Sequence, residues 1–209
     1  MAVPGRVLVA GGDLQVAGGE VVVMLGRSGS GKTSLINVAA GIVRPRAGVV
    51  AVAGEEISSA SGSARARHRL RHIGLVFQFA ELLPELTVSE NVALPLLLAG
   101  AARDDATVAA HVALDRVGLS GYGEQWPELV SGGEAQRAAI ARAIAPGPAL
   151  VLADEPTGAL DEENSRAVGS LFREIAAATG CGILVGTHDP VIAAFADRTI
   201  RIEQARLVV

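Results

Sequence analysis

A glycine-rich segment that ends in lysine and threonine is the clearest candidate for chemistry in this sequence. It reads Gly26-Arg27-Ser28-Gly29-Ser30-Gly31-Lys32-Thr33-Ser34 and has the spacing G-x-x-x-x-G-K-[ST] of a phosphate-binding loop. Glycines let backbone N–H groups turn toward phosphate oxygens, and a following helix N-terminus adds partial positive charge. We expect Lys32 to reach the β- and γ-phosphates and the Thr33 hydroxyl to hold Mg²⁺. The segment predicts a nucleoside triphosphate site.

The flanks of this loop have the pattern that such a site needs. Residues 21–25 form an apolar, β-branched run typical of a buried strand, and residues 34–40 read as a helix. A chance turn rich in glycine and serine that happened to end in Lys-Thr would not need this strand–loop–helix context. The context therefore favours the phosphate-binding interpretation.

Three further apolar runs also end in polar residues suited to phosphate chemistry. The runs and their polar ends are 73–77 with Gln78, 150–153 with Asp154 and Glu155, and 182–186 with His188 after Thr187. In open α/β sheets, ligands bind outside the carboxyl ends of the parallel strands. We therefore expect these side chains to meet the phosphate-binding loop at one edge of a parallel sheet.

The polar residues at the strand ends include candidate Mg²⁺ ligands. Asp154 would hold Mg²⁺ through a water, with Thr33 and Gln78 completing the shell, because Mg²⁺ prefers oxygen ligands and keeps several waters. Taken alone, the Asp-Glu pair could instead start a helix before Pro156. The sequence predicts a nucleoside triphosphate and Mg²⁺ as the bound groups.

Four residues are predicted to be catalytic: Lys32, Gln78, Glu155 and His188. Glu155 would orient and deprotonate the attacking water. His188 would hydrogen-bond the γ-phosphate and help to hold Glu155 and the water in line. Taken alone, His188 could instead be a helix-capping residue.

The segment Ser131-Gly132-Gly133-Glu134 carries a second anion-binding pattern. Ser131 and Glu134 have the spacing of a capping box for a helix over residues 135–145. That interpretation does not explain the two glycines, each of which costs a helix about 1 kcal/mol relative to alanine. Glycines expose backbone N–H groups for close approach to an anion. The phosphate-binding loop already supplies its own donors, so we expect this segment to contact the nucleotide of a second protomer.

Composition limits the possible partners. The chain has 209 residues, a net charge of −4 and a single cysteine, Cys181, which we expect to be buried. The negative charge gives no electrostatic reason to expect nucleic-acid binding. No apolar run approaches the ~20 residues of a membrane-spanning helix, so any membrane-spanning part would belong to another chain.

The order of these motifs resembles the ATP-binding cassette (ABC) ATPases, and the resemblance covers nearly the whole chain. Residues 82–92 and 131–137 are similar to the branch that drives lipoprotein release, macrolide and peptide export, and division-associated complexes. The resemblance implies a head-to-tail homodimer, or a pair with another cassette ATPase, in which residues 131–134 act in trans and Asp161 communicates between sites. It also implies a separate transmembrane permease subunit and a cytoplasmic location, peripheral on the inner face of the cell membrane.

The predicted fold class is α/β, a P-loop NTPase (RecA-like) core with a mainly parallel sheet, a small antiparallel β subdomain and an inserted helical subdomain. One ABC ATPase domain would span residues 1–209, with its core at 1–78 and 146–209 and a helical signature lobe at 79–145. We expect short strands within 7–16 and 49–57 in the antiparallel part, with turns at 11–12, 18–19 and 54. The basic stretch 65–72 reads as a helix with a solvated face, and its two histidines have weak metal-site potential.

The sequence departs from the family pattern in two ways. No aromatic residue precedes Phe77, whereas family members normally stack one on adenine, and Val130 and Ala135 replace the usual Leu and Gln of the signature. Two alternatives to a transporter motor follow. One is a nucleotide-binding module with little or no turnover, and the other is a soluble, non-transport ABC ATPase.

Overall fold

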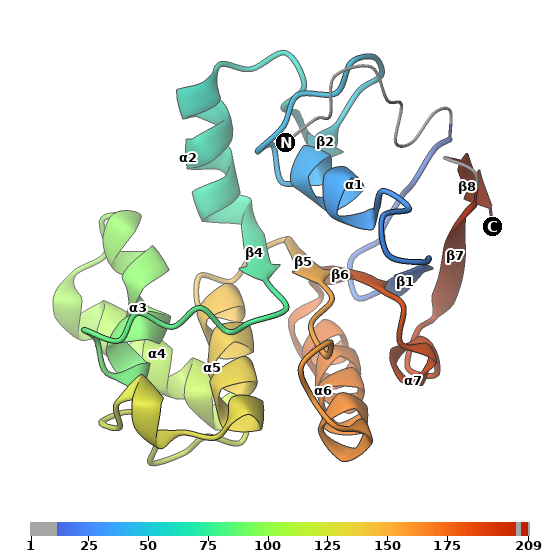
Figure 1. Ribbon diagram of the computed structural model, residues 1–209. Coiled ribbons are helices and arrows are strands. Elements are labelled where there is room, and N and C mark those ends of the chain that lie inside the picture. Colours follow the sequence, from blue (N-terminus) through green and yellow to red (C-terminus); the bar gives the residue numbers. More distant parts are fainter. Residues whose placement is uncertain (1–11, 204–205, 209) are drawn as a thin grey trace.

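A six-stranded sheet forms the centre of the molecule. The computed structural model describes residues 12–203 and 206–208 (Figure 1). The strands lie in the order β4-β5-β6-β1-β7-β8, and all neighbours are parallel except the antiparallel pair β7–β8. Their bounds are β1 Val21–Leu25, β4 Ile73–Val76, β5 Leu150–Asp154, β6 Gly182–Thr187, β7 Arg198–Glu203 and β8 Arg206–Val208. The antiparallel pair β7–β8 closes one end of the sheet.

Both faces of the sheet are covered, as the continuous apolar strands require. Val21 and Val23 belong to the hydrophobic cluster that includes α6 (Glu162–Thr179), whereas Val22 and Met24 belong to the cluster that includes α1 (Lys32–Ala39). Figure 1 shows α1 and α6 on opposite sides of the strands. The short helix α7 (Pro190–Ala193) follows β6. The α/β fold class with a mainly parallel sheet is confirmed.

Helices cluster beside one end of the sheet, next to β4 (Figure 1). They are α3 (Val88–Leu98), α4 (Arg103–Arg116), the 3₁₀ helix η1 (Pro127–Leu129) and α5 (Gly132–Ile144). Thr87 and Glu90 form the capping box of α3. The buried Asn91 side chain accepts from the Leu83 N–H and donates to three backbone carbonyls, which fixes the loop that enters α3. The subdivision at residues 79–145 remains a prediction.

The small antiparallel part of the fold is confirmed in one segment and differs in the other. Within residues 49–57, β2 (Ala51–Val52) and β3 (Glu55–Glu56) pair with each other as an antiparallel hairpin with the expected turn at Gly54. The backbone turns at Ala53 and Gly54, both of which have positive φ. Of the other expected strand, residues 7–11 lie outside the described part of the chain, and residues 12–16 are not in a strand.

The basic helix α2 (Gly62–His72) is not simply a solvated face. The Arg65 guanidinium donates to the carbonyls of Gly41 and Ala60, and Arg69 donates to the carbonyl of Ala40. His68 is buried, and its Nε2 lies 3.1 Å from the Val52 carbonyl oxygen. These contacts dock α2 against the β2–β3 hairpin and the end of α1, so its basic residues partly serve packing.

Candidate nucleotide site

The phosphate-binding loop joins β1 to α1 as predicted. Its glycines adopt backbone angles that other residues avoid, with φ of +77° at Gly29 and +114° at Gly31. Lys32 is the first residue of α1 and is only 4% exposed. Its Nζ donates to the Gly26 carbonyl at 2.6 Å and to the Arg27 carbonyl at 3.3 Å. The loop thus curls around the lysine ammonium.

A pocket of about 520 Å³ opens beside this loop. Its lining comes from the loop and α1, from the residues after β4, and from the end of β5. The lining residues are Ser28, Gly29, Gly31, Lys32, Thr33, Ser34, Phe77, Gln78, Phe79, Glu81, Asp154 and Glu155. The structure therefore brings Lys32, Thr33, Gln78, Asp154 and Glu155 together at the carboxyl edge of the sheet. We call this cavity the phosphate pocket.

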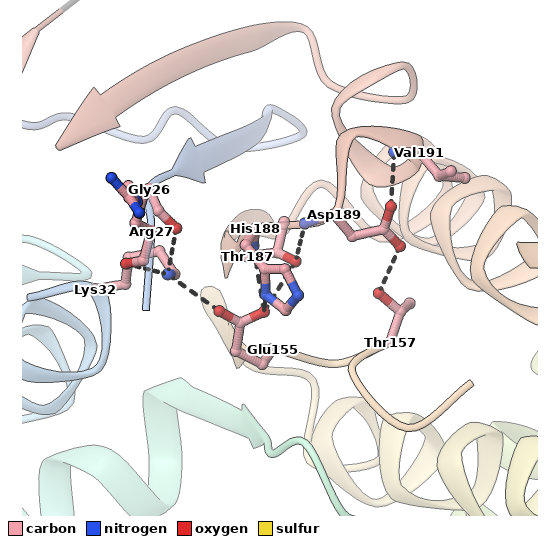
Figure 2. Close-up of polar contacts among 9 residues, drawn as sticks. All are labelled: Gly26, Arg27, Lys32, Glu155, Thr157, Thr187, His188, Asp189 and Val191. Atoms are coloured by element: carbon pink, nitrogen blue, oxygen red, sulfur yellow. Dashed lines mark hydrogen bonds and ion pairs between the residues drawn. The ribbon is translucent and has the colours of Figure 1, made fainter. Parts of the chain in front are cut away.

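The Glu155 carboxylate lies between Lys32 and His188 (Figure 2). Its Oε1 is 3.1 Å from Lys32 Nζ, and its Oε2 is 2.9 Å from His188 Nδ1. The same Oε2 accepts hydrogen bonds from the His188 N–H and the Thr187 hydroxyl. Histidine and glutamate are thus in direct contact, as the predicted positioning of Glu155 by His188 requires.

Glu155 itself is held in an unfavourable backbone conformation, with φ of +49°. Burial by itself raises the pKa of Glu155, but the hydrogen bond and charge of Lys32 and the hydrogen bonds from His188 outweigh it. The net result is a pKa below the usual value. The carboxylate is therefore ionised near neutral pH, the form that a general base needs.

Asp154 has a buried carboxylate oxygen suited to binding a cation. Its Oδ1 is buried and has no hydrogen-bond partner among the described residues. Burial raises the pKa of Asp154, a hydrogen bond with Thr33 lowers it, and the nearby Glu155 charge raises it further. The described residues contain no group of three or more His, Cys, Asp or Glu side chains suited to a metal. One carboxylate with a hydroxyl, an amide and phosphate oxygens suits Mg²⁺, which binds few protein groups.

Two side chains of α5 hold the loop that carries Gln78, and neither was among the site residues expected from the sequence. Gln136 is 2% exposed, and its Nε2 donates to the Phe77 carbonyl at 2.9 Å. Arg142 donates to the carbonyls of Ala80 and Glu81. The sequence does carry a signal that Gln136 is buried. It shares a helix face with Ala139, Ile140 and Ala143, which follow it by three, four and seven positions. A polar residue at such a position must find a buried partner.

The segment 131–134 lies at the start of α5, away from the phosphate pocket. None of these four residues, all within the described chain, lines that pocket. Ser131 and Glu134 form the expected capping box, and a Cβ at Gly133 would come 2.7 Å from Asn164 Oδ1. The Asp161 carboxylate caps α6 by accepting from the Asn164 N–H. This segment would have to reach a nucleotide other than the one in its own phosphate pocket.

Comparison with known proteins decides the family. The family model described as "ABC transporter" matches residues 9–158. The chain belongs to the ABC transporter family. It is 46% identical over 195 residues to the lipoprotein-releasing system ATP-binding protein LolD of Chromohalobacter salexigens, covering 93% of this chain and 82% of the relative. A LolD 2 protein of Caulobacter vibrioides is 44% identical over 200 residues, covering 96% and 88%.

Solved ABC cassettes share the fold of this ABC transporter chain. The dimeric cassette MJ0796 in a post-hydrolysis state, bound to ADP and Pi, superimposes with a TM-score of 0.86 at 31% identity, covering 97% of this chain and 89% of that one. A second dimeric structure of MJ0796 gives the same TM-score at 32% identity. The chain is therefore an ATP-binding, ATP-hydrolysing subunit of a membrane transporter, and the transporter interpretation is supported over both alternatives. Within the described residues, no helix is long and apolar enough to cross a membrane.

Proposed function

We propose that this chain hydrolyses ATP for a membrane complex of the export or extraction type that releases lipoproteins, because its LolD relatives are named as ATP-binding proteins of a lipoprotein-releasing system. It would work on the cytoplasmic, inner face of the cell membrane beside a separate transmembrane permease. The observation that carries the catalytic part is the convergence of Lys32, Asp154, Glu155 and His188 at one sheet edge. This cluster supplies a phosphate clamp, a cation ligand and a base within one site.

The proposed reaction begins when ATP enters the phosphate pocket. The backbone N–H groups of residues 28–33 receive the phosphates, and the Lys32 ammonium exchanges Glu155 for phosphate oxygens. Glu155 is then free to orient a water and take its proton, with His188 holding the carboxylate through Nδ1. Positioning and charge neutralisation, rather than a covalent intermediate, would carry the rate.

Mg²⁺ would be held by Asp154, Thr33 and Gln78, and when bound it would neutralise charge on the phosphate oxygens. The orphaned Asp154 Oδ1 supports this assignment. Gln78 lies on the loop that α5 grips through Gln136 and Arg142. Movement of the helical lobe would thus bring Gln78 toward or away from the site.

The second half of the site would come from another cassette chain, either a second copy or a paired ATPase. Residues 131–134 lie outside their own phosphate pocket, and MJ0796, which shares the fold, forms dimers. In a head-to-tail pair, Ser131 and the glycine N–H groups would contact the partner's γ-phosphate, and Asp161 would lie between the two sites. ATP would favour this closed pair because only the closed state makes both sets of contacts.

The permease would contact a groove of about 500 Å³ next to the phosphate pocket. The groove lies among residues of α2, α3, α5 and the loop after β4, and it shares Phe77 and Glu81 with the phosphate pocket. Leu98, which lines it, is 67% exposed. A permease segment seated there would touch the same loop that carries Gln78.

Dimerisation of a slow variant tests the catalytic proposal. Glu155→Gln with MgATP should form a stable dimer with little turnover, measured by sedimentation and phosphate release. Adding Gly132→Asp should abolish the dimer while ATP binding by the monomer stays nearly intact. A Glu155→Gln chain that stays monomeric in excess MgATP would refute the sandwich arrangement. Loss of monomer binding in Gly132→Asp would instead place residues 131–134 in the chain's own site.

The transport assignment needs a separate test. The chain would be co-expressed with a candidate transmembrane permease, purified as a complex and placed in proteoliposomes that contain an acylated lipoprotein. ATP should release the lipoprotein to a soluble acceptor, and Glu155→Gln should prevent release. ATP hydrolysis without release, in a complex that is otherwise intact, would point to a different cargo.

A further inference from the structure

The carboxylate of Glu134 accepts three hydrogen bonds at the start of α5. Its Oε2 accepts from the Ser131 N–H and from the Ser131 hydroxyl, each at 2.7 Å. Its Oε1 accepts from the Tyr122 hydroxyl, also at 2.7 Å. Hydrogen bonds to an ionised carboxylate are short and comparatively strong. Glu134 is thus fixed from two sides, by its own capping box and by a residue outside the motif.

Tyr122 is anchored by contacts outside the capping box of α5. It lies in the segment between α4 and η1, and its partly buried ring packs against the main hydrophobic cluster. Its N–H donates to the Leu119 carbonyl, and its own carbonyl accepts from the Gln125 N–H. Tyr122 is the single tyrosine of the chain. It therefore presents its hydroxyl from a fixed position to the carboxylate that organises residues 131–134.

The Ser131 hydroxyl has two competing tasks. In the structure its proton is donated to Glu134 Oε2. In the proposed dimer the same hydroxyl must donate to a phosphate oxygen, and a hydroxyl has one proton to give. When Ser131 turns to phosphate, Glu134 retains two donors, the Ser131 N–H and the Tyr122 hydroxyl. Without the Tyr122 hydroxyl, Glu134 would keep only the Ser131 N–H as a donor. Its negative charge would then be less well stabilised as the phosphate approaches.

We propose that Tyr122 is a positioning residue for ATP hydrolysis, which holds Glu134 in place while the Ser131 hydroxyl turns to the γ-phosphate bound by the other cassette. This inference rests on the proposed nucleotide sandwich. Tyr122 acts through Glu134 on Ser131 and does not touch the nucleotide of its own phosphate pocket, whose lining excludes it. Closure of the dimer should therefore depend on the Tyr122 hydroxyl, whereas nucleotide binding by the monomer should not.

The test compares Glu155→Gln with Glu155→Gln/Tyr122→Phe in saturating MgATP. Tyr122→Phe keeps the packed ring and removes only the hydroxyl. Each closed dimer contains two such sites, and losing a solvent-screened bond to a carboxylate costs about threefold at each. The dimer dissociation constant, measured by sedimentation equilibrium, should therefore rise about tenfold, while ADP affinity of the monomer stays the same. Thr107→Val removes a hydroxyl that bonds within α4 and should leave both values unchanged.

A double-mutant cycle separates positioning from a general loss of structure. Ser131→Ala removes the hydroxyl whose departure Tyr122 compensates, so Tyr122→Phe should cost much less in the Ser131→Ala background. An equal cost in both backgrounds, or an unchanged dissociation constant in Tyr122→Phe, would overturn the proposal. If the Glu155→Gln reference itself stays monomeric, the sandwich fails, and the Tyr122 proposal falls with it.

Discussion

Replacing Glu155 with glutamine should make the nucleotide-free chain less stable and yet make it bind ADP more tightly. In the nucleotide-free chain, Lys32 Nζ is paired with Glu155 Oε1 at 3.1 Å. Phosphates that occupy the loop must take the lysine away from this carboxylate. The ion pair therefore stabilises the empty chain and competes with the nucleotide, so its removal acts in opposite directions on stability and affinity.

The distance sets the size of both effects. Two unit charges 3.1 Å apart attract by about 5 kcal/mol at an effective dielectric constant near 20. Most of this offsets the desolvation of a lysine that is 4% exposed, and Lys32 keeps the Gly26 carbonyl as a partner. A net loss of about 1.5 kcal/mol is in the range for a hydrogen bond to a charged group. That lowers the unfolding midpoint by about 3–6 °C and raises ADP affinity about tenfold.

The assay uses ADP because it lacks the γ-phosphate on which dimer closure depends. Calorimetric titration gives the ADP dissociation constant, and thermal unfolding without nucleotide gives the midpoint. Glu162→Gln is the matched control, because Glu162 pairs with Arg166 on the exposed surface of α6 and should change neither value. Removing repulsion between Glu155 and phosphate would also tighten ADP binding but would not lower the midpoint. Tighter binding at an unchanged midpoint, or unchanged binding, would refute the role of the Lys32–Glu155 pair.

Two further predictions concern packing and protonation. Gly74→Ala should lower the free energy of unfolding by about 2–3 kcal/mol, measured by chemical unfolding, because a Cβ on β4 would collide with the Ala143 carbonyl. Gly62→Ala, which has open space around it, should leave the free energy of unfolding unchanged. A loss below about 0.5 kcal/mol in Gly74→Ala would contradict the tight contact between β4 and α5. The bonds from Ser131 and Tyr122 lower the pKa of Glu134 to about 2, so its contribution to stability is present above about pH 4.5 and lost as the pH falls toward 2. Ser131→Ala should move this pKa upward in a carboxyl NMR titration, and an unmoved pKa would contradict the assigned bonds.

The sequence predicted the phosphate pocket because each of its parts has a local pattern. Four apolar runs identify the strands, and their polar ends fall together once the strands are parallel. The capping boxes of α3 and α5 were also predictable, since a serine or threonine three positions before a glutamate is a local signal. Fold class and the grouping of Lys32, Asp154 and Glu155 therefore followed from residues close in sequence.

Contacts between distant segments could not be predicted in this way. The docking of Arg65 depends on the carbonyl of Gly41, twenty-four positions away. The grip of Arg142 on the Gln78 loop joins residues more than sixty positions apart. Such pairings depend on where the folded backbone leaves carbonyls without partners, which no sequence period reports.

The hydrogen bonds between α5 and the loop after β4 couple movement of this loop to movement of the whole helix. It runs from Gly132 to Ile144, a length of about 20 Å at 1.5 Å per residue. Gln136 holds the loop near the middle of the helix, and Arg142 holds it near the C-terminal end. A tilt of about 5° around Arg142, which lies about 16 Å along the helix axis from Ser131, would move Ser131 by about 1.4 Å, a displacement large enough to weaken or break a hydrogen bond. A small displacement of the loop after β4 in one chain would thus make or break the contact between its Ser131 and the phosphate bound by the neighbouring chain.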